Sequence, residues 1–435
     1  MIVAVCQTVL TGIACYALWR LARRSTSRIT AAGFLLRAFA AQALFWISWL
    51  RLPIASSLQI GEGLWFFSLD GAFYYRAANE LVLTGSSAAA SIPVVQFFAY
   101  WMLAFGNVVS AAILLNCFAY LGTALLIEDL GGRSSYTKIA LVALALNPSN
   151  ILWSTQPLKD SLFCFLLAAL VKLLDHWQLS WRRERAIDWR RFFAWTAAMI
   201  AVLFAIAATR AYMAVFICAL FVPFVVMVAA RGRRWDAAIL GVLLLLPLTQ
   251  VTRLGGGEEL RRVQRRIARP EHARMNFDQT GGGTHIIAGP LLAQGGRARS
   301  FAAGLAATFL PRTVAQPAGL VRIGGGRGLW FFADIDTLVF DATIVIAIAW
   351  CIRRLRAGAS LSPAFVFFLL LLLITAGPLI YSVTNFGTLF RLRQLIYVLA
   401  VLLPMTLAES SNPLGTQPGD ERVPAGDQHG REARE

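Results

Sequence analysis

The sequence predicts an all-α, polytopic membrane protein, and three observations support this prediction. Hydrophobic residues make up 58% of the 435 positions. Charged residues account for only 14%, less than a soluble chain of this length carries. Clusters of arginine separate the apolar runs on alternate connections, which is the distribution that orients helices in a membrane.

The charge, cysteine and histidine content narrows the class further. A formal net charge of +17 would suit a nucleic-acid partner, but the basic residues are nearly all arginine and stand between apolar runs. We therefore predict no nucleic-acid partner. Four histidines are scattered over loops and tail without a zinc spacing. All six cysteines fall within apolar stretches, where we expect packing residues rather than disulfides or metal ligands: Cys6, Cys15, Cys117, Cys164, Cys218 and Cys351.

About eleven transmembrane helices are predicted. The first has its positive charge after it, from Arg20 to Arg28, so we expect an outward N-terminus and no cleaved signal peptide. In chain order the predicted spans are Met1–Leu21, Ala31–Leu52, Val108–Ile127, Ile139–Asn147 with its flanks, Ser161–Leu174, Phe192–Thr209, Ala211–Ala230, Ala237–Val251, Ile335–Trp350, Ala364–Ser382 and Leu395–Leu407.

The predicted membrane domain covers residues 1–409 and contains two notable external loops. The first, residues 53–106, includes Ile92–Phe105, which is short for a span and has Pro93 near its start. If it crossed the membrane, the arginine-rich Trp181–Arg191 loop would face outward, so we predict a juxtamembrane helix. The second loop covers residues 252–333. Residues 410–435 combine proline, glycine and mixed charge, which predicts a disordered cytoplasmic tail.

One segment of the long loop is amphipathic. Leu260, Val263 and Ile267 recur at helical spacing among arginines until Pro270. We favour a helix lying on anionic lipid, and the alternative is a grip on a phosphate or an acidic glycan.

The stretch Leu64–Gly85 is the strongest candidate for chemistry. Asp70 stands there among six aromatic residues, including Tyr74 and Tyr75, at an expected membrane–water boundary. A carboxylate at that depth loses solvation, so its protonation becomes tunable, as a general base requires. The alternative is an interfacial anchor loop with one solvated acid.

Basic residues at the external ends of other spans are candidates for binding an anion. Lys159 precedes Asp160 at a helix start, where a lysine is unfavourable against the helix dipole. It either meets an anionic headgroup or pairs with Asp160. Arg210 lies between two predicted spans. Arg391 and Arg393 stand two apart, so a helix would splay them, whereas an extended backbone would aim both at one phosphate.

Three features over residues 64–174 together resemble the GT-C superfamily of membrane glycosyltransferases, which includes protein O-mannosyltransferases and aminoarabinose transferases. The first loop reads Asp70-Gly-Ala-Phe-Tyr74-Tyr75-Arg-Ala77, similar to the D-x-x-x-Y…A pattern of that superfamily. A proline-led segment then ends in Phe105-Gly106, and Lys159-Asp160 heads a later span. The acid of the family is often followed by a second acid, whereas here Gly71 follows.

The resemblance implies a polyprenyl-phosphate-linked sugar as donor and a glycan, lipid or protein as acceptor. It implies catalysis by Asp70 with inversion, at the periplasmic face of a bacterial inner membrane. Arg391, Arg393, Lys159 and Arg210 would bind the donor phosphate, supported by Asp160, Tyr74 and Tyr75. No cofactor and no metal site are expected.

Two other functions fit the sequence less well. A polysaccharide polymerase or O-antigen ligase has a similar number of spans and a late external loop with arginine and histidine, here Arg312, Arg322 and His285. A transporter of a lipid-linked sugar would place charges in mid-span and show repeat symmetry, and neither is visible.

Overall fold

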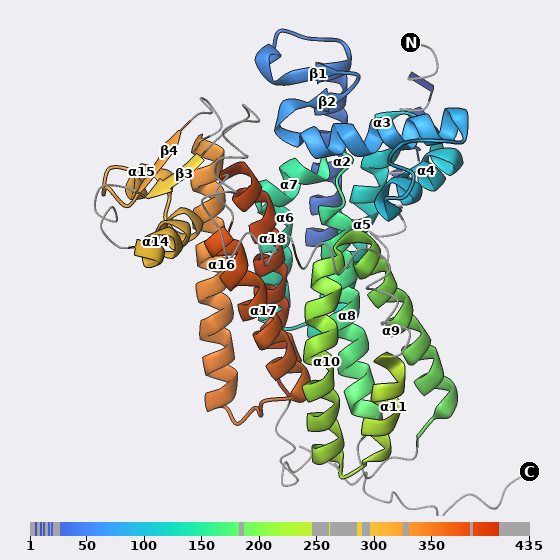
Figure 1. Ribbon diagram of the computed structural model, residues 1–435, viewed down its shortest axis with the longest axis vertical. Coiled ribbons are helices and arrows are strands. Elements are labelled where there is room, and N and C mark those ends of the chain that lie inside the picture. The colour runs from blue at the N-terminus through green and yellow to red at the C-terminus, as the bar shows by residue number, and fades with distance from the viewer. Residues whose placement is uncertain are drawn as a thin grey trace, which may run out of the picture.

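The chain folds into a bundle of long helices, as a computed structural model shows (Figure 1). It describes residues 27–181, 187–245, 261, 285–288, 296–324, 330–382 and 386–408, and some residues between 5 and 20. The helices are α2 (Arg28–Trp49), α3 (Leu69–Thr84), α4 (Pro93–Phe105), α5 (Val109–Gly131), α6 (Ser135–Leu146), α7 (Pro148–Ser154), α8 (Asp160–Ser180), α9 (Trp189–Thr209), α10 (Ala211–Gly232), α11 (Asp236–Leu245), α14 (Gly296–Phe309), α15 (Arg312–Ala315), α16 (Trp330–Arg356), α17 (Pro363–Ser382) and α18 (Phe386–Leu402).

Eight helices in the described ranges are long and apolar enough to cross a membrane, so a multi-pass membrane protein is confirmed. They are α2, α5, α8, α9, α10, α16, α17 and α18 with its continuation to Thr406. The predicted count of eleven is not confirmed. Met1–Leu21 and Ala237–Val251 fall partly or mostly outside the described residues, and the Ile139–Asn147 span is divided between two short helices.

The division between α6 and α7 follows from one dipeptide. Pro148 lacks a backbone donor and disfavours helical geometry at the preceding residue, so α6 ends after 12 residues. Asn147 is extended, and its side chain caps α7 by accepting from Asn150 N at 2.8 Å. Because α6 alone rises about 18 Å, it cannot cross a hydrocarbon core of about 30 Å without α7.

A buried arginine stabilises the broken end of α6. Arg37, in the middle of α2, donates to the carbonyls of Leu144 at 2.6 Å and Ala145 at 3.1 Å. Its guanidinium also lies 3.8 Å from the centre of the Tyr120 ring. These carbonyls belong to the last turn of α6, where the helix has no further backbone N–H groups to donate to them. The Arg37 guanidinium donates the hydrogen bonds instead.

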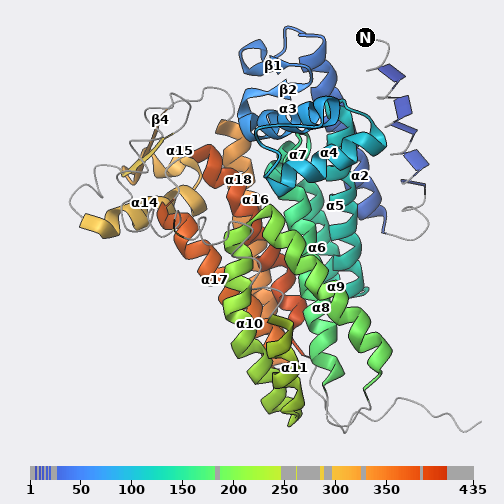
Figure 2. The ribbon, with the colours of Figure 1, turned by 45° about the vertical axis from the view of Figure 1, so that its right-hand side comes forward.

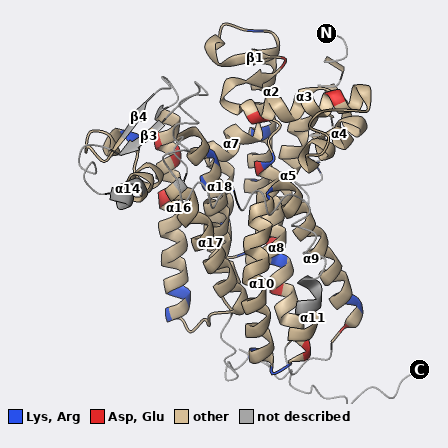
Figure 3. Cartoon of the chain, viewed as in Figure 1, with Lys and Arg blue, Asp and Glu red and all other residues tan. Residues whose placement is uncertain are grey.

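The long helices place two groups of connections at opposite ends of the bundle (Figures 1 and 2). At one end, Arg231 donates to the carbonyl of Leu361, and Arg234 lies 5.5 Å from the ring of Trp181. We call this the arginine-rich end. The other, here the α3 end, holds α3, the first residues of α8 and α18, and the α9–α10 junction. Figure 3 shows acidic and basic residues together beneath α3.

A small subdomain covers the α3 end. Strands β1 (Gln59–Gly61) and β2 (Leu64–Trp65) form an antiparallel hairpin, and α3 then runs across the bundle (Figure 1). Helix α4 has only 13 residues and packs against α3 and α5. Tyr75 of α3 donates to the carbonyl of Asn107, just before α5, at 2.9 Å. The chain therefore returns to the α3 end after α4.

A second small unit lies beside α16 and α17 near the same end (Figures 1 and 2). Strands β3 (His285–Ala288) and β4 (Val321–Gly324) pair antiparallel, with Ile286 opposite Ile323. Asp334 of α16 accepts from the backbone N–H of Arg312 at 2.6 Å, which ties α15 to the bundle. The predicted amphipathic helix 260–274, apart from Arg261, and the tail 410–435 lie outside the described residues.

Candidate functional site

Four elements that are distant in sequence bring charged side chains together at the α3 end. Asp70 lies in the first turn of α3, Asp160 begins α8, Arg210 joins α9 to α10, and Arg391 lies in α18. With Lys159 beside Asp160, the group has three cations and two carboxylates, and therefore one net positive charge. We call these five residues the charge cluster.

A buried ion pair forms the base of the charge cluster. The Arg210 guanidinium donates to Asp160 Oδ1, and the two side chains are only 6% and 2% exposed. Asp160 stands at the N-terminus of α8, where the helix dipole favours a carboxylate. Arg210 also donates to the Tyr212 hydroxyl at 3.3 Å. This pair fixes the start of α8 against the α9–α10 junction.

Arg391 is shared between the two carboxylates. Its Nη1 lies 2.7 Å from Asp70 Oδ2, and its Nε lies 3.6 Å from Asp160 Oδ2. Asp160 is buried, whereas the Asp70 side chain is 53% exposed. Asp70 is therefore the carboxylate of the cluster that a ligand can reach, and Arg391 lies directly behind it.

Lys159 and Tyr74 form the edge of the cluster. The Lys159 ammonium lies 5.7 Å from the centre of the Tyr74 ring, within the range of a cation–π contact. Burial, together with the charge of Asp70, raises the pKa of Tyr74 to about 12. The phenol is therefore neutral at physiological pH and can donate a hydrogen bond but cannot serve as a base.

Tyr75 has a different role from its neighbour. Its hydroxyl donates to the Asn107 carbonyl, away from the cluster, and burial raises its pKa to about 12. It ties α3 to the start of α5. The predicted supporting role at the site therefore applies to Tyr74, and Tyr75 supports the position of α3.

Gly71 explains the departure from the acidic pair that the family pattern leads us to expect. A Cβ at this position would lie 2.6 Å from Ser68 Oγ and 3.5 Å from Pro157 Cδ. The absence of a side chain lets α3 approach the α7–α8 connection, which carries Lys159 and Asp160. A side chain directly after Asp70 would require Ser68 to move.

The structure corrects the predicted pairing of Arg391 and Arg393. Both lie in α18, so they point in different directions, as expected of a helix rather than an extended segment. Arg393 is 1% exposed and donates to Asp336 of α16 and to Thr337 Oγ1 at 2.9 Å. Asp336 in turn accepts from Ser149 N of α7 at 2.7 Å. Arg393 therefore joins three helices and lies outside the charge cluster.

Removing Arg393 is expected to unfold the protein rather than affect turnover selectively. Arg393→Ala leaves Asp336 buried without its cation, which costs roughly 3–5 kcal/mol. Thermal unfolding in detergent measures this loss, with exposed Arg356→Ala as the control. The double variant Arg393→Met with Asp336→Asn should recover part of the stability, because the amide oxygen would still accept from Ser149 N. If the Arg393→Ala protein is as stable as wild type but inactive, the structural role is wrong and Arg393 acts at the site.

The residues that the polymerase alternative needs lie on other elements than those of the charge cluster. His285 lies in β3 and Arg322 in β4, and Ile287 rather than His285 stands opposite Arg322. Arg312 Nε donates to Gln316 Oε1 within its own turn of helix, at 2.9 Å. These residues belong to the unit beside α16 and α17.

Sequence reasoning did not identify Asp336, Tyr212 and Arg37. Asp336 and Arg37 each stood inside a predicted span, and Arg37 lies in the middle of α2, so the expectation that no charge stands in mid-span is wrong. An ionisable residue at that depth is itself a signal, because it requires a partner. No sequence signal marks Tyr212. Among the described residues, no three His, Cys, Asp or Glu side chains are grouped to hold a metal ion.

Comparison of the whole chain with protein-family models, with curated proteins and with solved structures gives no match. What the site does is therefore inferred from its geometry and chemistry.

Proposed function

We propose that the chain is an inverting glycosyltransferase of the GT-C kind, which moves a sugar from a polyprenyl-phosphate donor to an acceptor. One observation carries the proposal: an accessible carboxylate, Asp70, lies 2.7 Å from a guanidinium, Arg391, at one end of a membrane bundle. A base and a phosphate-binding cation are the two groups that such a transfer requires.

The chemistry assigns each group one task. Asp70 takes the proton of an acceptor hydroxyl while that oxygen forms its bond to the anomeric carbon. The bond between the anomeric carbon and the phosphate oxygen breaks, and the phosphate leaves with the electron pair. Arg391, together with Lys159 of the same cluster, stabilises the charge that grows on this phosphate. A single displacement of this kind inverts the anomeric centre.

The buried part of the cluster positions Arg391 rather than contacting substrate. Asp160 holds both Arg391 and Arg210, so the guanidinium of Arg391 is fixed before the donor arrives. The net positive charge of the five residues matches the single negative charge of a phosphodiester. We therefore place the donor phosphate beside Arg391 and Lys159, and the acceptor on the exposed side of Asp70.

The direct test is transfer by purified protein in nanodiscs. An extract of polyprenyl-phosphate sugars serves as donor and a glycan extract as acceptor, and mass spectrometry detects the product and its anomeric configuration. No product with any donor in the extract contradicts the proposal. A product formed from a lipid-linked oligosaccharide, with Asp70 dispensable, would favour a polymerase or ligase.

The proposal also assigns the α3 end to the external face of a bacterial inner membrane, because the arginine clusters lie at the opposite end. In a cysteine-free background, Glu62→Cys should react with an impermeant maleimide in spheroplasts. Arg356→Cys should react only after permeabilisation. The reverse pattern would invert the topology and remove the donor site from the external face.

A further inference from the structure

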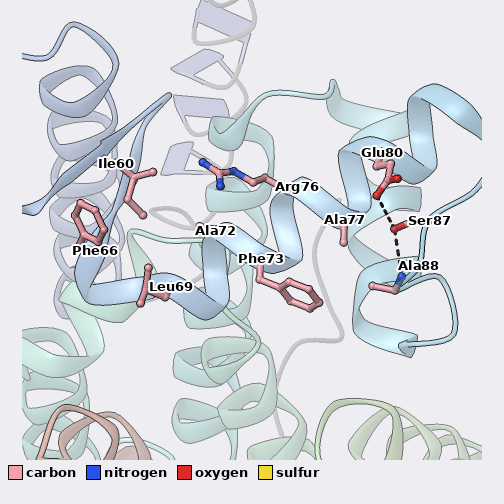
Figure 4. A pocket seen from close by; sticks show the side chains of 11 residues that line it. Ile60, Phe66, Leu69, Ala72, Phe73, Arg76, Ala77, Glu80, Ser87 and Ala88 are labelled. Carbon is pink, nitrogen blue, oxygen red and sulfur yellow. Dashed lines mark hydrogen bonds between the residues drawn. The ribbon is translucent and has the colours of Figure 1, made fainter. Parts of the chain in front are cut away.

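A cavity of about 590 Å³ lies along one face of α3 (Figure 4). Pockets of this size hold small molecules or a few linked rings. The hairpin closes one end and the turn before α4 closes the other. The cavity is lined by Ile60, Phe66, Leu69, Ala72, Phe73, Arg76, Ala77, Glu80, Ser87, Ala88 and Ala89.

The cavity is adjacent to the proposed base. Phe73 lines the cavity and follows Asp70 by three residues, so the two side chains neighbour each other on the helix surface, and Asp70 borders the cavity without lining it. The Phe73 ring meets the Tyr74 ring edge-on, with centres 5.8 Å apart, and Tyr74 borders the charge cluster. A ligand held in this cavity can therefore present one group to the exposed carboxylate of Asp70.

The lining combines aromatic faces with one donor group and one acceptor group. Phe66 and Phe73 remain about half exposed. Arg76 and Glu80 stand one helical turn apart, and Figure 4 shows Glu80 close to Ser87. Ser87 Oγ donates to Glu80 Oε2 at 3.0 Å. Arginine only donates hydrogen bonds and a carboxylate only accepts them.

These charges select the ligand class. An anion attracted by Arg76 would also be repelled by Glu80. A cation attracted by Glu80 would likewise be repelled by Arg76. A hydrocarbon chain would remove water from both charges without replacing their hydrogen bonds. An uncharged sugar fits all three constraints, because its hydroxyls both donate and accept while the C–H face of its ring packs on an aromatic side chain.

We propose that this cavity holds an uncharged sugar ring of a glycan acceptor, with one hydroxyl directed to Asp70. The inference rests on the proposed function and narrows its acceptor from glycan, lipid or protein to a neutral glycan.

Saturation-transfer NMR on the protein in nanodiscs tests the inference. The probes are maltose, cellobiose, lactose and N,N′-diacetylchitobiose, with glucuronate and a serine-rich peptide for comparison. At least one neutral disaccharide should receive saturation through its ring protons. Phe73→Ala should weaken that binding about tenfold, since the aromatic contact is lost. Glu80→Gln should also weaken it, because a charged acceptor is replaced by a neutral one.

Matched variants separate this inference from the proposed function. Tyr100→Ala removes an exposed ring of α4 that does not line the cavity, so binding should not change. Asp70→Asn should lower transfer by about 10²–10⁴-fold and leave sugar binding within about twofold, since the contacts in the cavity remain. If the neutral sugars fail to bind, or bind equally well to Phe73→Ala, the acceptor inference fails while a donor site at Arg391 still stands. Binding of the peptide or of glucuronate alone would also overturn it.

Discussion

Replacing Asp70 with asparagine is expected to lower transfer by about 10²–10⁴-fold, the usual loss when a general base is removed. The amide keeps the shape of the side chain but cannot accept the proton. Because Asp70 is half exposed and its removal leaves Arg391 paired with Asp160, the fold should survive. Donor binding should be retained, since Arg391 loses a competing carboxylate and not a partner it requires.

The assay is single-turnover transfer in nanodiscs, with polyprenyl phosphate binding measured in parallel. Asp70→Glu should be partly active at best, because one more methylene displaces the carboxylate from the acceptor oxygen. Glu62→Gln removes another exposed acid from the same segment and should leave transfer unchanged. If Asp70→Asn transfers at the wild-type rate, Asp70 is an anchor-loop residue and the proposed chemistry is wrong.

The second large effect is expected at Arg391. Arg391→Ala should reduce turnover by about 10²–10³-fold, as when one preorganised donor is removed from a developing charge. Arg391→Lys should recover only part, because a point charge cannot contact Asp70, Asp160 and a phosphate as a fork does. Both variants should weaken binding of polyprenyl phosphate, which separates this effect from that of Asp70→Asn.

Arg51→Ala is the matched control, an exposed cation before the β1–β2 hairpin. Its turnover and phosphate binding should equal those of wild type. Should Arg391→Ala fold normally and keep full turnover, the phosphate binds elsewhere. Because Asp160 keeps Arg210 as a partner in this variant, loss of folding is not the expected outcome.

Periodicity and charge were sufficient for the class of the protein and for most of its spans. Runs such as Ala211–Ala230 are apolar throughout and lie between basic clusters, and the structure has α10 over nearly the same residues. The sequence could not predict where α6 would end. Asn147-Pro148 breaks a run that hydropathy counts as continuous. The side chain that stabilises the end of α6 is Arg37, which belongs to another helix.

The candidate site could be predicted residue by residue but not as an arrangement. Asp70, Lys159, Arg210 and Arg391 all stood at the same ends of predicted spans, and the structure brings them together. Arg393 looked equivalent to Arg391 because only backbone geometry distinguishes them. Each residue along a helix turns the side-chain direction by about 100°. Arg391 and Arg393 therefore point in different directions, Arg391 toward the charge cluster and Arg393 toward the buried Asp336.

The ion pair between Asp70 and Arg391 also has a consequence for biogenesis. The ribosome produces the first loop early and α18 last among the described spans, and the two partners stand 321 positions apart in the chain. Contacts of such long sequence separation form late in folding. While the chain is still being inserted, the proposed base has no guanidinium beside it, and the three-helix junction at Arg393 is also missing. We therefore expect the proposed activity to begin only when α18 has entered the bundle, and a product of premature termination before residue 386 to be inactive.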